Sequence, residues 1–164
     1  YPLYRKIEEL GVPVIFHCGI EFEFKDSSRF AKPVNYEVLV NFSRLRFALA
    51  HICWPWVDEC IALWGRFRAA LDEVEGAGDE VQMYIDITPG TPLIYRREAL
   101  QKLLAYGAED YIIFGTDCLA GNLGECARKH IERDIAILEQ LIGAHRETIE
   151  KIMYRNALRF LKLV

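Results

Sequence analysis

Four short apolar runs recur along the chain, and a segment with helical spacing of apolar residues follows each of them. The runs are apolar along nearly their whole length and cover residues 12–16, 45–50, 81–87 and 111–114. Strands buried on both faces read as such continuous runs and are typical of a parallel sheet covered by helices. The pattern therefore predicts an α/β fold in which four parallel strands alternate with helices.

Apolar residues three or four positions apart predict the helices. They cover residues 1–10, 35–42, 57–71, 96–106, 125–142 and 147–163. We expect the helix over residues 57–71 to pack its apolar stripe against the sheet. Residues 21–32 show no clear period and are expected to form a long loop over the open end of the sheet, and residues 75–79 are expected to form a turn.

The composition fits a single domain, residues 1–164, without a nucleic-acid or membrane partner. The chain is 52% hydrophobic, which is enough for a core, and its net charge of −4 comes from mixed charges without a basic stripe. No apolar run approaches the roughly 20 residues of a membrane span, and the first residues do not read as a signal peptide. We therefore expect a cytoplasmic protein that acts on a small-molecule substrate. The five scattered cysteines argue against a disulfide framework.

The side chains that follow the predicted strands form a candidate site. His17, His51 and Asp117 each lie just past the apolar residues of a strand, and Asp86 lies at the end of the third strand. Carboxyl ends of parallel strands meet at one edge, where α/β folds bind ligands. Each residue has a simpler reading, because a single His or Asp after a strand is often a hydrogen-bonded loop residue or a turn cap. Three at the same relative position favour a shared metal or proton-transfer site.

Four passages carry a resemblance to a known family. GVPVIFHCG, RLRFALAH, YIIFGTDCLAGNLGE and YRNALRFL resemble the C-terminal half of the amidohydrolase superfamily. The most similar group is the branch that includes aminocarboxymuconate-semialdehyde decarboxylase and the resorcylate-type decarboxylases. The resemblance implies a distorted (β/α)₈ TIM barrel that holds one divalent metal, commonly zinc. It implies metal ligation by His17 and Asp117, and catalytic roles for His51 and Asp117. We interpret Asn156 as a helix cap.

The resemblance also implies that part of the barrel lies outside this chain. A (β/α)₈ barrel takes about 250 residues, so four βα units are half of one. The His-X-His pair of the family's first strand does not occur here, and the chain begins with Tyr1. Half a barrel leaves two strand edges unpaired. We expect that the chain is the C-terminal part of a longer enzyme, or that a partner or self-association into a homo-oligomer completes it.

The resemblance implies a metal-dependent hydrolase that activates water to cleave a C–N or C–O bond of a small molecule. One alternative is nonoxidative decarboxylation of a cyclic or aromatic acid, and another is a noncatalytic half barrel. A carboxylate-binding Arg would favour decarboxylation, and Arg29 and Arg96 are candidates that fit the surface equally well. We expect Trp54, Arg29 and Asp86 to contact the substrate. The family pattern differs at Ile52 and Cys53 and at Cys118 and Leu119. These differences alter the walls of the pocket, so the substrate of a family member does not predict the substrate of this protein.

A cysteine-based site is a separate hypothesis. Cys18, Cys53 and Cys118 each lie one or two residues past a candidate ligand, which permits soft-metal binding or redox sensing. Neighbouring residues of a strand face opposite ways, so these thiols are not expected to point at the same centre as the ligands. We expect His130 and His145 at the surface.

Overall fold

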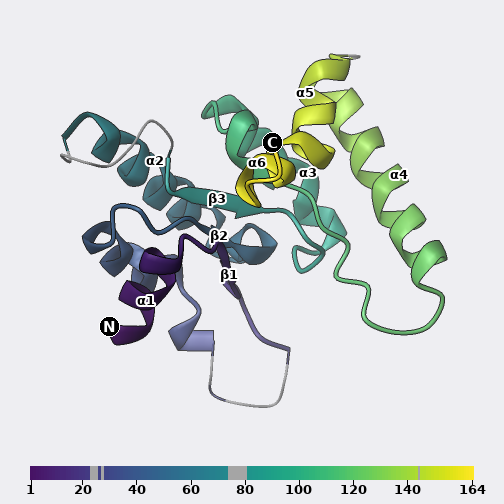
Figure 1. The fold of residues 1–164 in the computed structure, drawn as a ribbon. Coiled ribbons are helices and arrows are strands. Elements are labelled where there is room, and N and C mark those ends of the chain that lie inside the picture. Colours follow the sequence, from purple (N-terminus) through teal and green to yellow (C-terminus); the bar gives the residue numbers. More distant parts are fainter. Residues whose placement is uncertain (23–25, 27, 74–80, 144) are drawn as a thin grey trace.

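The computed structural model describes residues 1–22, 26, 28–73, 81–143 and 145–164, and its centre is a four-stranded parallel sheet (Figure 1). The strands are β1 (Val14–Phe16), β2 (Phe47–Leu49), β3 (Met83–Asp86) and β4 (Ile112–Ile113). Their spatial order is β1-β2-β3-β4, so strands that follow one another in the chain are neighbours in the sheet. The predicted α/β fold with four parallel strands is confirmed, and all four strands end at the same edge.

Helices connect the strands at nearly the predicted positions. They are α1 (Pro2–Leu10), α2 (Val57–Glu73), α3 (Leu93–Ala105) and α4 (Leu123–Ile142), joined by the short 3₁₀ turns η1 (Ser28–Phe30), η3 (Ala50–Cys53) and η4 (Glu109–Tyr111). The helix expected over residues 35–42 is instead the 3₁₀ segment η2 (Pro33–Asn41). The expected turn over residues 75–79 and part of the expected loop over 21–32 lie outside the described residues.

The tail forms three consecutive helical pieces where one helix was predicted. It consists of α5 (Arg146–Glu150), the π-helical segment η5 (Lys151–Arg155) and α6 (Asn156–Phe160). The prediction that Asn156 caps a helix is wrong, because the residue lies inside this continuous helical stretch. Its buried amide donates to the carbonyls of Glu109 (2.7 Å) and Ile112 (2.8 Å) and so fastens the tail to β4.

One face of the sheet carries the main core. Phe47 and Met83 point from the strands toward Trp64 and Phe67 of α2, and the rings of Phe47 and Phe67 lie 5.1 Å apart between centroids. Each of these side chains is at most 1% exposed. Fully burying one such side chain contributes roughly 1.5–3 kcal/mol. The apolar stripe of α2 therefore packs on the sheet as predicted.

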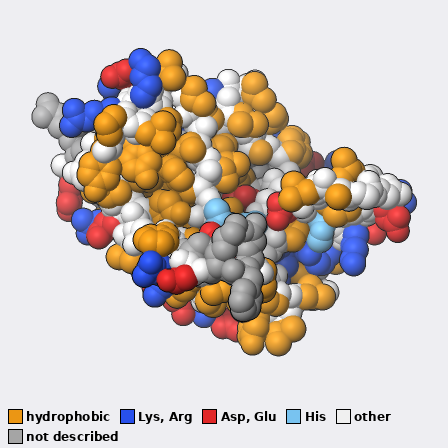
Figure 2. Space-filling view, turned by 90° about the horizontal axis from the view of Figure 1, so that it is seen from below, with side chains coloured by type: hydrophobic (Ala, Val, Ile, Leu, Met, Phe, Trp, Pro, Cys, Tyr) orange, Lys and Arg blue, Asp and Glu red, His pale blue; other side chains and the backbone are white. Residues whose placement is uncertain are grey.

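The other face is covered only in part. Phe160 of α6 packs on Ala48, Tyr84 and Ile113, with 5.1 Å between the ring centroids of Tyr84 and Phe160. Ile15 of β1, the neighbour of Ala48 in the parallel register, remains 54% exposed. Figure 2 shows many hydrophobic side chains at the surface of one side of the molecule, with a histidine and acidic side chains beside them.

None of the helices in the described part of the chain has the length and apolar character that crossing a bilayer requires.

Candidate functional site

A pocket of about 450 Å³ opens at the edge where the strands end. It is lined by His17, Ile20, Glu21, Phe22, His51, Trp54, Pro89, Gly90 and Asp117. His17 follows β1, His51 follows β2 and Asp117 follows β4, and the rings of the two histidines lie 5.1 Å apart between centroids. The structure thus brings together the three residues that the sequence pattern selected, while their catalytic and metal-binding roles stay predictions.

Unusual backbone conformations occur at two of these three residues, His51 and Asp117, and at the two residues that follow His51. His51, Ile52, Cys53 and Asp117 all have left-handed φ angles, between 51° and 62°. Each such conformation costs a non-glycine residue on the order of 1 kcal/mol or more, and such strain clusters at functional sites. Gly90 permits the close approach of His51, since a Cβ atom there would lie 2.5 Å from the imidazole Cγ.

A chain of hydrogen bonds links His51 to the end of β3. The Thr88 hydroxyl donates to Asp86 Oδ2 (3.1 Å) and lies 3.0 Å from His51 Nδ1, while the Thr88 backbone N–H donates to Asp86 Oδ1 (2.9 Å). A hydroxyl has one proton to donate. Because an ionised Asp86 accepts that proton, the Thr88 oxygen accepts a hydrogen bond from His51 Nδ1–H. The neutral imidazole then has its proton on Nδ1, and Nε2 is the unprotonated nitrogen that accepts hydrogen bonds.

The pKa values of both Asp86 and His51, the two ends of this hydrogen-bonded series, are shifted. Burial raises the pKa of Asp86 to about 6, against the lowering effect of the two Thr88 hydrogen bonds. Burial, reinforced by the neighbouring His17, lowers the pKa of His51. At neutral pH the carboxylate of Asp86 is therefore mostly ionised and His51 is neutral, which is the state that a proton acceptor requires.

We predict that Asp86→Asn stabilises the fold at neutral pH. The raised pKa means that the folded state holds a proton which the unfolded state releases above its ordinary value of 3.8. The free energy of unfolding therefore falls as pH rises from about 4 to about 6. Above that range the buried, ionised Asp86 lowers it by about 1–3 kcal/mol. Urea unfolding at pH 7.5 and pH 3.5 measures the effect. A stabilisation present only at the higher pH is expected, whereas equal destabilisation at both would contradict it.

The other predicted substrate-contact residues lie in different places. Trp54 lines the pocket and stacks on Tyr95 with 5.8 Å between ring centroids. Arg29 is not among the lining residues, and its exposed guanidinium pairs with Asp26 (3.5 Å). Asp86 is not among the lining residues either. It accepts a hydrogen bond from Thr88, whose hydroxyl contacts His51 in the pocket. Thr88 was not among the predicted site residues, although the order Asp-Ile-Thr at the end of a strand was an available signal.

Arg96 is neither a mouth residue nor a surface residue, so both readings of it were wrong. It is fully buried and donates to both carboxylate oxygens of Asp134 in α4, at 2.7 and 2.6 Å, and to the carbonyl of Ile87 (2.5 Å). Burial raises the pKa of Asp134, but hydrogen bonds from Arg133 and Arg96 outweigh it, so that pKa lies below its ordinary value. The pair joins α3 and α4 to the end of β3.

The cysteines correct one expectation and support another. Cys118 and Cys126 form a disulfide, although no disulfide framework was expected. Cys18 and Cys53 are buried, and burial together with hydrogen bonds among neighbouring thiols raises the pKa of Cys53 well above its ordinary value. No cysteine is among the pocket-lining residues of the described chain, in agreement with the expectation that the thiols do not share the centre of His17 and Asp117.

The family model described as "Amidohydrolase" matches residues 1–163. The chain therefore belongs to the amidohydrolase family, whose members generally use a divalent metal, and the predicted membership is confirmed. No curated protein gives a significant match.

Solved structures with the same fold are about twice as long as this chain. An uncharacterized TIM-barrel protein from Bordetella bronchiseptica is similar with a TM-score of 0.67 and 23% identity, over 99% of this chain and 50% of its own. A 2,6-dihydroxybenzoate decarboxylase complexed with 2,6-dihydroxybenzoate is similar with a TM-score of 0.56 and 18% identity, over 99% and 54%. The four strands thus form half of a TIM barrel, as predicted.

Proposed function

We propose that this chain supplies the C-terminal half of the active site of a metal-dependent hydrolase, which activates water to cleave a C–N or C–O bond of a small molecule. The observation that carries the proposal is the convergence of His17, His51 and Asp117 on one pocket. Three residues from the ends of three strands, two of them in left-handed backbone conformations, are the arrangement by which TIM-barrel enzymes build a catalytic centre.

The donor set in the pocket suits a divalent metal, and we propose zinc. An imidazole nitrogen from His17 and a carboxylate oxygen from Asp117 are typical ligands of zinc, and a catalytic zinc takes three protein ligands. We propose that the remaining ligands come from the barrel half that this chain does not include, which also covers the exposed sheet edges. Such a metal, when bound, supplies Lewis acidity and lowers the pKa of water to about 7.

Asp117 and His51 would handle the proton of the attacking water. Asp117, which is exposed to the pocket, accepts a proton from the attacking water and returns it to the leaving group. His51, which is neutral, presents Nε2 as an acceptor, so it would accept a hydrogen bond from the attacking water and orient it. Thr88 holds the imidazole in that tautomer, with Asp86 behind it.

We predict that Thr88→Val lowers kcat by about 10- to 100-fold, because partners that fix a histidine tautomer contribute effects of that size. Valine keeps the methyl group that packs near Gly115 but removes the hydroxyl between His51 and Asp86. Thr88→Ser is the matched control and should retain kcat. Steady-state kinetics separate kcat from KM, and equal losses in the Val and Ser variants would remove the hydroxyl from the mechanism.

Nonoxidative decarboxylation of an aromatic acid is the second candidate. Trp54 and Phe22 line the pocket with flat apolar surface, and a similar structure is that of a decarboxylase with an aromatic acid bound. However, neither Arg nor Lys is among the described residues that line the pocket. A substrate carboxylate is usually held by such a cation, which is why hydrolysis is the first proposal.

The test is an assay of the complete protein in ¹⁸O-labelled water. Lactones, cyclic amides and hydroxybenzoates are offered with zinc and, separately, with a chelator. Hydrolysis predicts ¹⁸O in the product, loss of turnover with the chelator and recovery with added zinc. Release of CO₂ with no ¹⁸O in the organic product would overturn hydrolysis in favour of decarboxylation, and absence of turnover across the panel would favour a noncatalytic role.

A further inference from the structure

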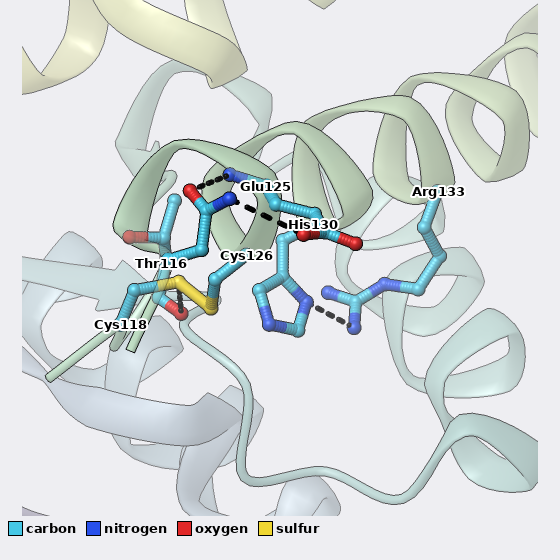
Figure 3. Close-up of a disulfide and its surroundings, with 7 residues drawn as sticks. Thr116, Cys118, Glu125, Cys126, His130 and Arg133 are labelled. Carbon is cyan, nitrogen blue, oxygen red and sulfur yellow. Dashed lines mark hydrogen bonds between the residues drawn. A yellow bond between two sulfur atoms is a disulfide. The ribbon is translucent and has the colours of Figure 1, made fainter. Parts of the chain in front are cut away.

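Three soft-metal ligands gather outside the pocket, where the loop after β4 meets the first turns of α4 (Figure 3). The ligand atoms of Cys118, Cys126 and His130 all lie within 4.8 Å of one another, and the three residues are partly exposed. Cys126 and His130 are four positions apart on α4 and therefore share one face of the helix. Cys118 approaches that face from the loop.

We propose that, when the disulfide is reduced, Cys118, Cys126 and His130 form a second metal site that binds zinc. Two thiolates and one imidazole are a ligand set that zinc uses in proteins, with water completing the tetrahedral coordination. In the structure the two sulfur atoms are bonded to each other. The metal and the disulfide are thus alternative states of the same two cysteines, and the site is distinct from the pocket of His17 and Asp117.

The conversion is balanced in electrons and protons. A dithiol reductant transfers two electrons and two protons to the bond between Cys118 and Cys126, which leaves two thiols on the protein and a disulfide on the reductant. Zinc then binds the two sulfurs and releases their two protons to solvent. Exchange with a small-molecule disulfide reverses the conversion: it takes two electrons from the two sulfurs and two protons from solvent to become two thiols, the bond between Cys118 and Cys126 forms again, and the zinc is released.

The surroundings hold the ligands in place. Asn122 caps α4, because its side-chain oxygen accepts from the backbone N–H of Glu125 (3.2 Å), so the turn that carries Cys126 is fixed. In the disulfide form His130 Nδ1 accepts from Arg133 (2.8 Å), which orients the ring beside the sulfurs before a metal binds (Figure 3). The carboxylate of Asp134 binds the same guanidinium at 2.9 Å through each of its oxygens and thereby compensates its charge. Metal binding through Nε2 moves the ring proton to Nδ1 and replaces the Arg133 bond.

Absorption spectroscopy with Co²⁺ as a zinc substitute tests the proposal. Thiolate-bound Co²⁺ gives a near-ultraviolet charge-transfer band, whereas Co²⁺ bound by His17 and Asp117 has no sulfur ligand. The complete protein, reduced with a phosphine, is expected to show the band with a stoichiometry of one Co²⁺ per chain, and the disulfide form is expected to lack it. The band does not depend on turnover, so its failure is distinguishable from failure of the proposed hydrolysis.

Variants assign the ligands. Cys118→Ser combined with Cys126→Ser should abolish the band, and His130→Ala should weaken Co²⁺ binding by about tenfold or more, since even outer-shell partners of a metal contribute that much. His145→Ala, at an exposed position, and Cys60→Ala, at a thiol outside the cluster, are controls that should retain it. A band that survives loss of Cys118 and Cys126, or unchanged affinity without His130, would overturn the site, as would absence of the band in the reduced protein.

Discussion

Asp117→Asn is expected to lower kcat by about 10²- to 10⁴-fold, the range that a positioned general acid or base contributes. Asparagine has nearly the same shape but does not accept a proton, and it is a weaker metal ligand than a carboxylate. The backbone φ of Asp117 is 52°, a left-handed conformation that asparagine adopts as readily as aspartate. We therefore expect the loss to appear in kcat while the folded structure is retained.

The matched control for this variant is Asp58→Asn. Asp58 is an exposed carboxylate that pairs with Lys102 (3.0 Å) and is not among the residues lining the pocket. Its substitution should leave kcat unchanged. Steady-state kinetics, metal analysis and circular dichroism of both variants complete the comparison, and near-normal turnover of Asp117→Asn would remove this residue from the proposed mechanism.

Arg96→Met is expected to destabilise the fold by about 3–5 kcal/mol, because removing one partner of a buried pair leaves the other charge without compensation. Arg96 and Asp134 are both fully buried, and the arginine also binds the carbonyl of Ile87. Asp134 would still pair with the partly exposed Arg133 (2.9 Å), so its charge would be partly compensated. We therefore expect a destabilisation near the lower end of this range. Urea unfolding of the variant measures it.

Two further variants test the origin of this destabilisation. Arg97→Met changes the adjacent, exposed position and should alter the free energy of unfolding by no more than about 0.5 kcal/mol. The double variant Arg96→Met with Asp134→Leu removes both charges and should recover most of the loss, because well-packed apolar residues replace buried ion pairs at little cost. A double variant no more stable than Arg96→Met would show that packing, not the unpaired carboxylate, causes the destabilisation.

The sheet was predictable because its strands are buried on both faces. Phe47 and Ala48 face opposite cores, yet both are apolar, and such runs are typical of parallel strands between layers. The 3₁₀ segment over Pro33–Asn41 and the π-helical segment over Lys151–Arg155 were not predictable, since their apolar spacing resembles that of an α-helix. Only the hydrogen-bond pattern of the folded chain distinguishes them.

The candidate site was predictable to the extent that topology determines it. His17, His51 and Asp117 follow strands whose carboxyl ends must meet, so their position in the sequence indicates a common edge. Arg96 and Asp134 form a buried ion pair across 38 positions, which no local pattern reveals. For Asn156 the local sequence indicated a cap, but its tertiary contacts with Glu109 and Ile112 determine its role.

The most direct test of the central claim is anomalous diffraction at the zinc absorption edge from crystals of the complete protein grown with zinc. We predict a peak in the pocket at about 2.0–2.2 Å from an imidazole nitrogen of His17 and a carboxylate oxygen of Asp117. Zinc found only elsewhere in the molecule, or a zinc in the pocket that neither side chain contacts, would contradict the account.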